Sequence, residues 1–468
     1  MDDALTRDLL IEVAEATASY LASLGERTVR AEVTAGELRR RLDVPLEADG
    51  ADDREVIRSL AELGAIATVA TAGPRFFGFV NGGSLPVALA AELLAVGWDQ
   101  NAAMAVMSPL ASVTEEVAGR WIIDLLGLDA SCSFGFVTGG QSATTTCLAA
   151  ARHHVLAGHG WDVEANGLAG GPAVTTIVGE QRHATVDASL RVLGFGAPTV
   201  VVGADGQGRM RPDLLGEALA AAAGPTVVCV QAGNVVTGAF DPMADLVAMA
   251  RPHGAWVHVD GAFGGWAAAA PALRHLTAGM AAADSWSVDG HKLLNVPYDC
   301  GYAITAHPAS HRAACSSAAS YYVIGSADEP RDGMMWVLDA SRRARGVATY
   351  AALRGLGRDG VADLIERLCA HARHFADLVG DVDGIEVVND VVFNQVAVRF
   401  GADDAHTAAV IAALQDEGEC WAGGARWDDR AVMRWSVANW STTTEDIERS
   451  AAAVIRRHRA VGGDPTRP

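Results

Sequence analysis

Short apolar runs alternate with helical patterns through the middle of the chain. Apolar segments typical of buried strands lie at 134–137, 174–178, 199–202, 226–230, 255–259 and 301–304. Between them, the spacing of apolar positions predicts helices over 108–126, 142–155, 185–193, 212–222 and 242–251. Short β-branched strands separated by helices predict parallel strands that are joined by crossovers and buried on both faces, which is α/β architecture.

The pattern differs on both sides of this region. Residues 1 to about 70 have helical spacing. After about residue 335, a long helix over 341–379, with a kink expected between Gly355 and Gly360, precedes strand-like 385–388, 395–399 and 433–437 and a helix over 406–417. We therefore predict an N-terminal helical segment (1–75), a large domain (76–335) and a smaller α+β domain (336–468).

The composition excludes several classes of protein. A chain of 468 residues, half of them apolar, can bury a large core, and its net charge of -21 argues against nucleic acid or an anionic membrane as a partner. The start of the chain lacks the features of a signal peptide, and no apolar run is long enough to span a bilayer. Seven scattered cysteines without a CxxC pair predict neither disulfides nor a metal site, and favour the cytoplasm.

One residue type is nearly absent. The chain contains a single lysine, Lys292, among 36 basic residues. Arginine can replace lysine as a surface charge, but it cannot lose a proton and attack a carbonyl as an amine does. Lys292 is therefore either a residue retained for its chemistry or one that escaped replacement by chance.

Four polar features follow predicted strands, where an open parallel sheet binds its ligands. They are Gly139-Gly140 before a helix, His183 at a strand-to-helix junction, Asp260 after a strand, and Asp289-Gly290-His291-Lys292. Each has an ordinary structural explanation, since a glycine pair forms turns and Asp or His can cap a helix. Together they offer a phosphate cradle, a partner for a protonated ring nitrogen, a ring that can stack and an amine.

The sequences of these segments resemble those of the group II pyridoxal-phosphate decarboxylases, which include glutamate, aromatic-amino-acid and diaminobutyrate decarboxylases. The matching segments run from about Gly73 to the C-terminal domain, and they are GPRFFGFV, SPLASVTEEVAGRW, FVTGGQSATTTCLAAAR, GEQRHATVDASLRVLGFG, AGNVVTGAFDP, AWVHVDGAFGG, ADSWSVDGHKLLNVPYDCG, SRRARG and MRWSVANWSTTTEDI. The resemblance implies fold type I, which is aspartate-aminotransferase-like, with a mostly parallel seven-stranded sheet in the large domain.

The resemblance also implies roles for individual residues. Lys292 is similar to the lysine that carries the cofactor as a Schiff base, and Asp260 to the acid that keeps the pyridine nitrogen protonated. His183 resembles the histidine stacked on the ring, with Ala262 beneath it. The other positions expected to bind the cofactor are Gly140, Gln141, Ser142, Asn234, Asp289 and His291.

The substrate and its proton donor are less well defined. Tyr321, or its neighbour Tyr322, resembles the loop tyrosine that protonates the α-carbon after CO2 leaves. Phe79, Asn81 and Gly82 resemble substrate-pocket positions, and we expect a bulky or aromatic L-amino acid. Relatives are homodimers with shared active sites, and the resemblance implies the same assembly here.

The expected reaction is therefore decarboxylation of an L-amino acid to its amine. The sequence departs from the common motifs of this family at three places. They are Asn234 in place of the usual threonine, Leu293 after the lysine, and the segment Gln141-Ser142-Ala143. These departures leave the cofactor anchors intact but keep two alternatives open: an oxidative outcome that yields an aldehyde, or other chemistry of the same cofactor. A non-catalytic dimeric paralogue is the alternative of another class.

Overall fold

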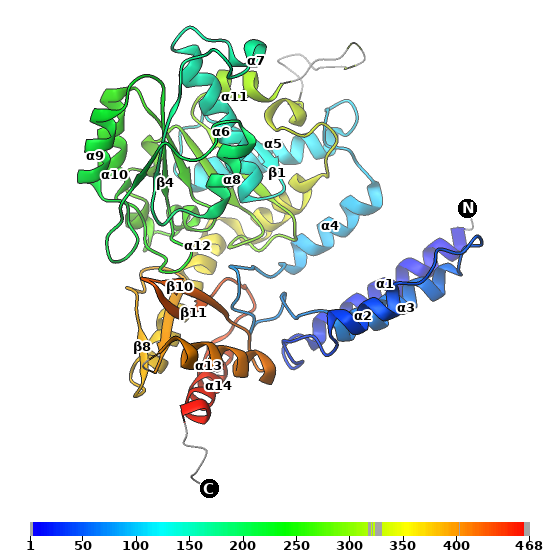
Figure 1. Ribbon diagram of the computed structural model, residues 1–468. Helices are drawn as coiled ribbons and strands as arrows, with labels where there is room; N and C mark the ends of the chain where they lie inside the picture. Colours follow the sequence, from blue (N-terminus) through cyan, green and yellow to red (C-terminus); the bar gives the residue numbers. More distant parts are fainter. Residues whose placement is uncertain (1–2, 317–319, 321, 323–329, 402, 463–468) are drawn as a thin grey trace.

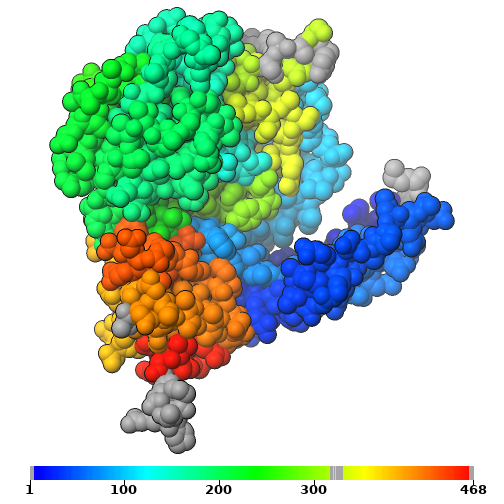
Figure 2. Space-filling model, in the orientation of Figure 1, coloured from blue at the N-terminus to red at the C-terminus, as the bar shows by residue number. Residues whose placement is uncertain are grey.

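The computed structural model describes residues 3–316, 320, 322, 330–401 and 403–462 (Figure 1). The chain begins with three helices, α1 (Asp3–Ser23), α2 (Ala35–Leu42) and α3 (Asp53–Ala67), which project from the body as an arm (Figures 1 and 2). Thr34 begins α2 with a capping box formed with Glu37. None of the helices in the described ranges is long and apolar enough to cross a membrane.

The body is built on a seven-stranded sheet with the order β1-β7-β6-β5-β4-β2-β3. The five strands from β3 to β6 in this order are parallel, whereas β7 runs antiparallel to both β6 and β1. This arrangement confirms the expectation of a mostly parallel sheet. The strands are β1 (Ser133–Val137), β2 (Thr175–Gly179), β3 (Val200–Val202), β4 (Thr226–Gln231), β5 (Trp256–Asp260), β6 (Ser285–Asp289) and β7 (Gly301–Thr305).

Helices cover the sheet, as the alternating pattern predicts (Figure 1). α6 packs along β5, β6 and β7, and its inner face is almost entirely buried. The helices of the body are α4 (Pro86–Trp98), α5 (Pro109–Leu125), α6 (Gly140–Ala157), α7 (Val163–Asn166), α8 (Ala184–Val192), α9 (Pro212–Ala221), α10 (Met243–Ala250) and α11 (Pro308–Cys315). Short 3-10 turns lie at Arg251–His253, Gly264–Ala269, Arg274–Thr277, Met280–Ala282 and Gly333–Trp336.

The C-terminal part contains a second, antiparallel sheet. α12 (Arg345–Gly380) leads into it and is broken at Gly357, whose φ of 65° confirms the expected kink. The sheet has the order β10-β11-β9-β8, and its core is continuous with that of the large sheet. Its elements are β8 (Ile385–Val387), β9 (Gln395–Phe400), α13 (Asp404–Glu417), β10 (Gly423–Trp427), β11 (Arg430–Ser436) and α14 (Thr444–Gly462).

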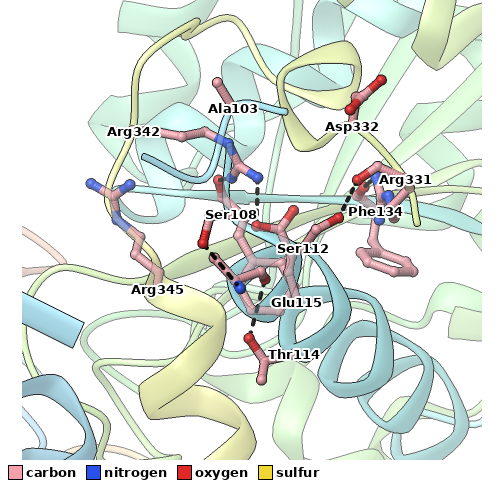
Figure 3. A network of polar contacts seen from close by, with 12 residues as sticks. Ala103, Ser108, Ser112, Thr114, Glu115, Phe134, Arg331, Asp332, Arg342 and Arg345 are labelled. Carbon is pink, nitrogen blue, oxygen red and sulfur yellow. Dashed lines mark hydrogen bonds and ion pairs between the residues drawn. The ribbon is translucent and has the colours of Figure 1, made fainter. Parts of the chain in front are cut away.

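Two arginines cover the open side of the edge strand β1 (Figure 3). Arg331 donates to the carbonyl of Phe134, and Arg342 donates to the carbonyl of Phe136 at 3.0 Å. These carbonyls are two residues apart, so they point to the same side of the strand. Glu115 from α5 pairs with Arg342 at 2.5 Å, and both side chains are only 2% exposed. Side-chain donors thus replace a neighbouring strand along β1.

Candidate active site

A cavity of about 340 Å³ opens beyond the carboxyl ends of the parallel strands. It brings together residues from distant parts of the sequence, which the expected α/β topology requires. The predicted site residues on its wall are Phe79, Gly140, Gln141, His183, Asp260, Ala262, Asp289, His291 and Lys292. The wall also contains Val80, Thr185, Gln231, Gly233, Val235, Phe263 and Arg434, which were not predicted.

Lys292 lies just after β6 and points toward the carboxylate that ends this strand. Its Nζ is 3.0 Å from Oδ2 of Asp289, which is 2% exposed. The ring of Phe263 lies on another side, with its centroid 5.8 Å from Nζ. The single amine of the chain is therefore placed in the cavity beside a buried acid.

Asp260 ends β5 at the next position along the sheet. Its side chain is 8% exposed, and its Oδ1 accepts a hydrogen bond from the backbone N–H of Ala262 at 3.3 Å. Burial raises the pKa of the Asp260 carboxyl, while the positive charges of Lys292 and His183 favour its ionised form. The carboxylate thus caps the following turn and also faces the cavity. Asp260 can therefore act both as a cap and as the partner of a protonated ring nitrogen.

Two histidines lie on the wall of the cavity. His183 is the N-cap of α8, and its Nδ1 is 2.7 Å from Oγ1 of Thr185. Partial loss of water around the ring lowers the pKa of His183, which favours the neutral imidazole. Burial likewise lowers the pKa of His291, whose Nδ1 accepts from the backbone N–H of Cys300 at 3.1 Å. The ring of Tyr298 stacks on His291 with centroids 4.2 Å apart.

The start of α6 forms a cradle for an anion. Gly139 precedes the helix without a side-chain cap, so the first backbone N–H groups are open to a ligand. A Cβ at Gly140 would lie 3.0 Å from Oδ2 of Asp289, so a side chain at this position would crowd the carboxylate. Ser142 lies in the first turn, and its hydroxyl is 2.7 Å from that of Thr138 rather than on the cavity wall.

The predicted substrate positions form a turn at the mouth of the cavity. Phe79 and Val80 both have left-handed backbone, with φ of 55° and 59°, and for a β-branched residue this is an unusual conformation. Phe79 is 63% exposed and faces the opening. Asn81 accepts from the hydroxyl of Tyr298 at 2.8 Å, and the N–H of Gly82 donates to the carbonyl of His291. Asn81 and Gly82 thus border the wall without forming it.

Two predicted residues have other positions. The side chain of Asn234 is bound to backbone, since its Oδ1 accepts from Val236 and Thr237 and its Nδ2 donates to the carbonyl of Gln181. It therefore shapes the turn after β4 and does not line the cavity. Tyr321 lies outside the described residues. Its neighbour Tyr322 packs against a cluster that includes Met334 and Met335.

Arg434 is the residue that sequence reasoning missed. It reaches the cavity from β11 of the smaller sheet, and its guanidinium donates to the carbonyl of Val235 at 3.2 Å. The next residue, Trp435, stacks between Phe77 and Phe375 with ring centroids 3.9 Å away on each side, which fixes the strand. Burial lowers the pKa of Arg434. A charge within an apolar strand was the signal available in the sequence.

These groups fit pyridoxal phosphate. The site has an amine for the aldehyde, a buried carboxylate for the ring nitrogen, an imidazole beside the cavity and uncapped helix N–H groups for the phosphate. A Cβ at Gly139 would lie 2.8 Å from Cε1 of His291, so the glycine backbone before α6 is in close contact with this ring. No group of three or more metal-ligating side chains occurs among the residues described.

Comparison with known proteins identifies the family of the chain. Residues 36–401 match the pyridoxal-dependent decarboxylase conserved domain. L-tyrosine/L-DOPA decarboxylase 2 of Lophophora williamsii is 27% identical over 415 residues, covering 85% of this chain and 77% of the relative. Human cysteine sulfinic acid decarboxylase is 26% identical over 372 residues (78% and 74%), and 4-hydroxyphenylacetaldehyde synthase of Rhodiola rosea is 26% identical over 452 (92% and 90%).

The fold has close counterparts among solved structures. The crystal structure of Oryza sativa TDC with PLP and tryptamine has a TM-score of 0.90 at 23% identity, and the match covers 98% of this chain and 99% of that one. The likeness shows the fold, which is the expected fold type I with a mixed, mostly parallel sheet. The chain therefore belongs to the pyridoxal-dependent decarboxylases, a family of amino-acid carboxy-lyases that use pyridoxal phosphate.

Proposed function

We propose that this chain removes CO2 from an L-amino acid to give the corresponding amine, with Lys292 as the residue that carries the cofactor. The observation that carries this proposal is the position of the single lysine, 3.0 Å from a buried carboxylate on the wall of the cavity. The bound cofactor supplies an electron sink for the electrons left behind by CO2. The residues of the chain hold the cofactor, orient the substrate and supply the proton that takes the place of CO2.

The cofactor-binding roles follow from position and charge. Asp260 supports a positive charge on the ring nitrogen, because a buried carboxylate favours a cation beside it. His183 offers a mostly neutral ring to stack on the cofactor, with Ala262 on the cavity wall below it. Gly140 and Gln141 at the start of α6 offer backbone N–H groups to the phosphate, together with His291.

Arg434 is proposed to bind the substrate. Apart from Lys292, it is the only lysine or arginine on the described wall of the cavity, so it is the group best able to pair with a carboxylate of an amino acid. Its position on the smaller sheet means that the substrate would contact both sheets. Asn81 and Gly82, which were predicted as substrate-pocket positions, lie off the wall, and we assign the carboxylate contact to Arg434.

The expected substrate class is a bulky or aromatic L-amino acid. Phe79, Val80, Val235 and Phe263 give the described wall a largely apolar side. One arginine can neutralise one carboxylate, which leaves no second described cation for an acidic side chain. The relatives named above act on both aromatic and acidic amino acids, so the wall of this chain, rather than the family, supports the choice.

The fate of the reaction depends on the proton donor. Tyr321 is proposed to protonate the α-carbon, with Tyr322 as the alternative, and retention of this tyrosine pair favours an amine. The relative from Rhodiola rosea is named as an aldehyde synthase, so an oxidative outcome is the second candidate. The retained lysine, acid and histidine argue against a non-catalytic paralogue.

A second copy of the chain is the proposed partner. Apolar side chains are exposed on α4 and α5, where Leu93, Leu94, Val96, Leu110 and Val113 have exposed fractions between 42% and 60%. Exposed apolar surface of this kind marks an interface. The arm formed by α1–α3 projects from the body (Figure 2), and we propose that it contacts the second copy. Sedimentation equilibrium at several protein concentrations would identify a dimer, and a stable monomer would contradict it.

A product screen tests the reaction. The purified, cofactor-loaded protein is incubated in air with a panel of L-amino acids, and the products are identified by mass spectrometry. An amine establishes the decarboxylase and its substrate, whereas an aldehyde with peroxide supports the oxidative candidate. Absence of the visible absorbance of a lysine-bound cofactor, together with no product, would refute the proposal.

A further inference from the structure

The contact between Lys292 and Asp289 has a consequence for how the lysine changes its protonation state. An amine can bond to a carbonyl carbon only after it has lost its proton, so an ammonium at this position needs a proton acceptor. Asp289 is in contact with Nζ at 3.0 Å, and its backbone is fixed by two hydrogen bonds. Its N–H donates to the carbonyl of Ala262, and its carbonyl accepts from Nε1 of Trp266, both at 2.9 Å.

The carboxylate occupies a slot made of glycine backbone. A Cβ at Gly140 would lie 3.0 Å from Oδ2, and one at Gly301 would lie 3.0 Å from Oδ1. Oδ1 is buried and has no hydrogen-bond donor among the described residues. Glycine on two sides therefore leaves Oδ2 open to Nζ of Lys292, the group that it contacts at 3.0 Å.

Two basic side chains lie near Asp289: Nζ of Lys292 is 3.0 Å from Oδ2, and Nε2 of His291 is 3.7 Å from Oδ1. Burial lowers the pKa of His291 and raises that of Cys300 to about 11 and that of Tyr298 to about 12, so these groups are mostly uncharged at neutral pH. Burial also raises the pKa of Tyr302, and loss of water lowers that of His183. Asp260 is the other acid that the charge of Lys292 affects, but within the described residues the ion pair of this ammonium is with Asp289. Lys292 is thus the cation in contact with the carboxylate.

We propose that Asp289 is the acid–base partner of Lys292, an inference that rests on the proposed role of this lysine. Before Lys292 bonds to the aldehyde carbon of the cofactor, an N–H bond of the ammonium breaks and an O–H bond forms on Oδ2 of Asp289. The nitrogen–carbon bond would then replace the carbonyl bond of the aldehyde, whose oxygen would leave as water. The proton returns to the nitrogen when the lysine is released. The net charge of the site does not change in this transfer, and a buried ion pair becomes a buried neutral pair, which a low-dielectric site accommodates.

The rate of cofactor loading tests this transfer without relying on turnover. Cofactor-free protein is mixed with pyridoxal phosphate, and the visible absorbance is followed by stopped flow. Borohydride reduction and mass spectrometry then confirm attachment to the single lysine. In D289N we expect loading at neutral pH to slow roughly a hundredfold, because the amide cannot accept the proton. The rate of D289N should also rise steadily with hydroxide concentration, since the proton must then pass to solvent.

Two further variants separate a proton acceptor from a structural role. D284N changes an aspartate that precedes the opposite end of β6 and pairs with His307, and it should load like the wild type. D289A opens the slot, and added formate should restore its loading rate while leaving the wild type unchanged. Formate rescue also tests the proposal if D289N fails to fold.

The remaining outcomes overturn it. Equal loading rates in D289N and wild type would show that Asp289 takes no proton, and faster loading would show that it only holds the ammonium in place. Failure of D289A to respond to formate would count in the same direction. If the wild type itself attaches no pyridoxal phosphate, the proposed function fails, which distinguishes that result from failure of this inference alone.

Discussion

The ion pair behind β1 provides the sharpest test of how the fold is held. In E115Q the glutamate that pairs with Arg342 becomes an uncharged group of nearly the same shape. Both side chains are 2% exposed, and Arg331 places a second guanidinium close by, whose pKa burial lowers to about 10. The substitution therefore leaves buried positive charge without a counter-ion (Figure 3).

The expected loss follows from this burial. Removing one partner of a buried ion pair lowers the free energy of unfolding by about 3–5 kcal/mol. The loss in E115Q should be about 3 kcal/mol, because the glutamine oxygen still accepts a hydrogen bond from Arg342. The matched control is E116Q, whose glutamate pairs with Arg120 on the surface of the same helix, where the loss should be about 0.5 kcal/mol or less. The assay is urea unfolding of the cofactor-loaded protein, fitted for both midpoint and slope.

The result that would refute this reasoning is an E115Q protein that unfolds like E116Q. A second comparison separates charge from shape, because E115Q/R342M removes the uncompensated cation and should recover part of the loss. E115Q should also release pyridoxal phosphate more readily than E116Q, since β1 leads directly into Gly139 and Gly140. Unchanged cofactor retention with a large loss of stability would separate the two effects.

Four other predictions concern the site and the pH dependence of stability. K292A should lose the visible absorbance of the bound cofactor and all measurable turnover, and near wild-type turnover would reject the assignment. D260N should weaken cofactor binding and lower kcat, measured by absorbance titration and initial rates, because the amide cannot support a charged ring nitrogen. R434M should raise KM by roughly tenfold or more with the cofactor spectrum unchanged, and an unchanged KM would exclude a carboxylate contact. His258 and His311 are buried with their pKa lowered to about 3, below the ordinary value near 6.5. The unfolded chain therefore binds more protons below about pH 6.5, so stability should be complete above that pH and fall as the pH decreases toward 3, by about 2 kcal/mol per histidine at pH 5 in urea unfolding.

The sequence predicts the elements of the body well, because their signals are local. Short β-branched runs correspond to β1, β2, β4, β5 and β7, and the glycines at 355–360 mark the break in α12 at Gly357. α4 was missed because its apolar residues follow one another without helical spacing, and many of them remain exposed in the single chain. The strand at 301–304 was among those expected to be parallel, whereas β7 is antiparallel to both of its neighbours, since strand direction depends on pairing rather than on local pattern.

The candidate site was predicted from the types of residue that follow the strands of the large sheet. The prediction lacked residues that reach the cavity from distant parts of the fold. Lys292, Asp260 and His183 follow strands or begin a helix, so their convergence at one edge is a consequence of topology. Arg434 comes from the other sheet, and its approach depends on how Trp435 packs, which no local pattern encodes. Asn234 illustrates a different difficulty. The sequence predicted that this residue binds the cofactor, whereas its side chain forms hydrogen bonds with backbone groups.

The arginines along β1 also protect the protein from its neighbours. A strand with open carbonyls at the edge of a sheet is a template on which another chain can add a strand, and natural proteins block such edges. Here the block is made of two side chains from the segment 331–342, which a covalent change or a local opening of that segment could withdraw. Loss of this cover would expose apolar β1 for intermolecular pairing, so aggregation, rather than simple unfolding, is the expected fate of variants that lose both guanidinium groups.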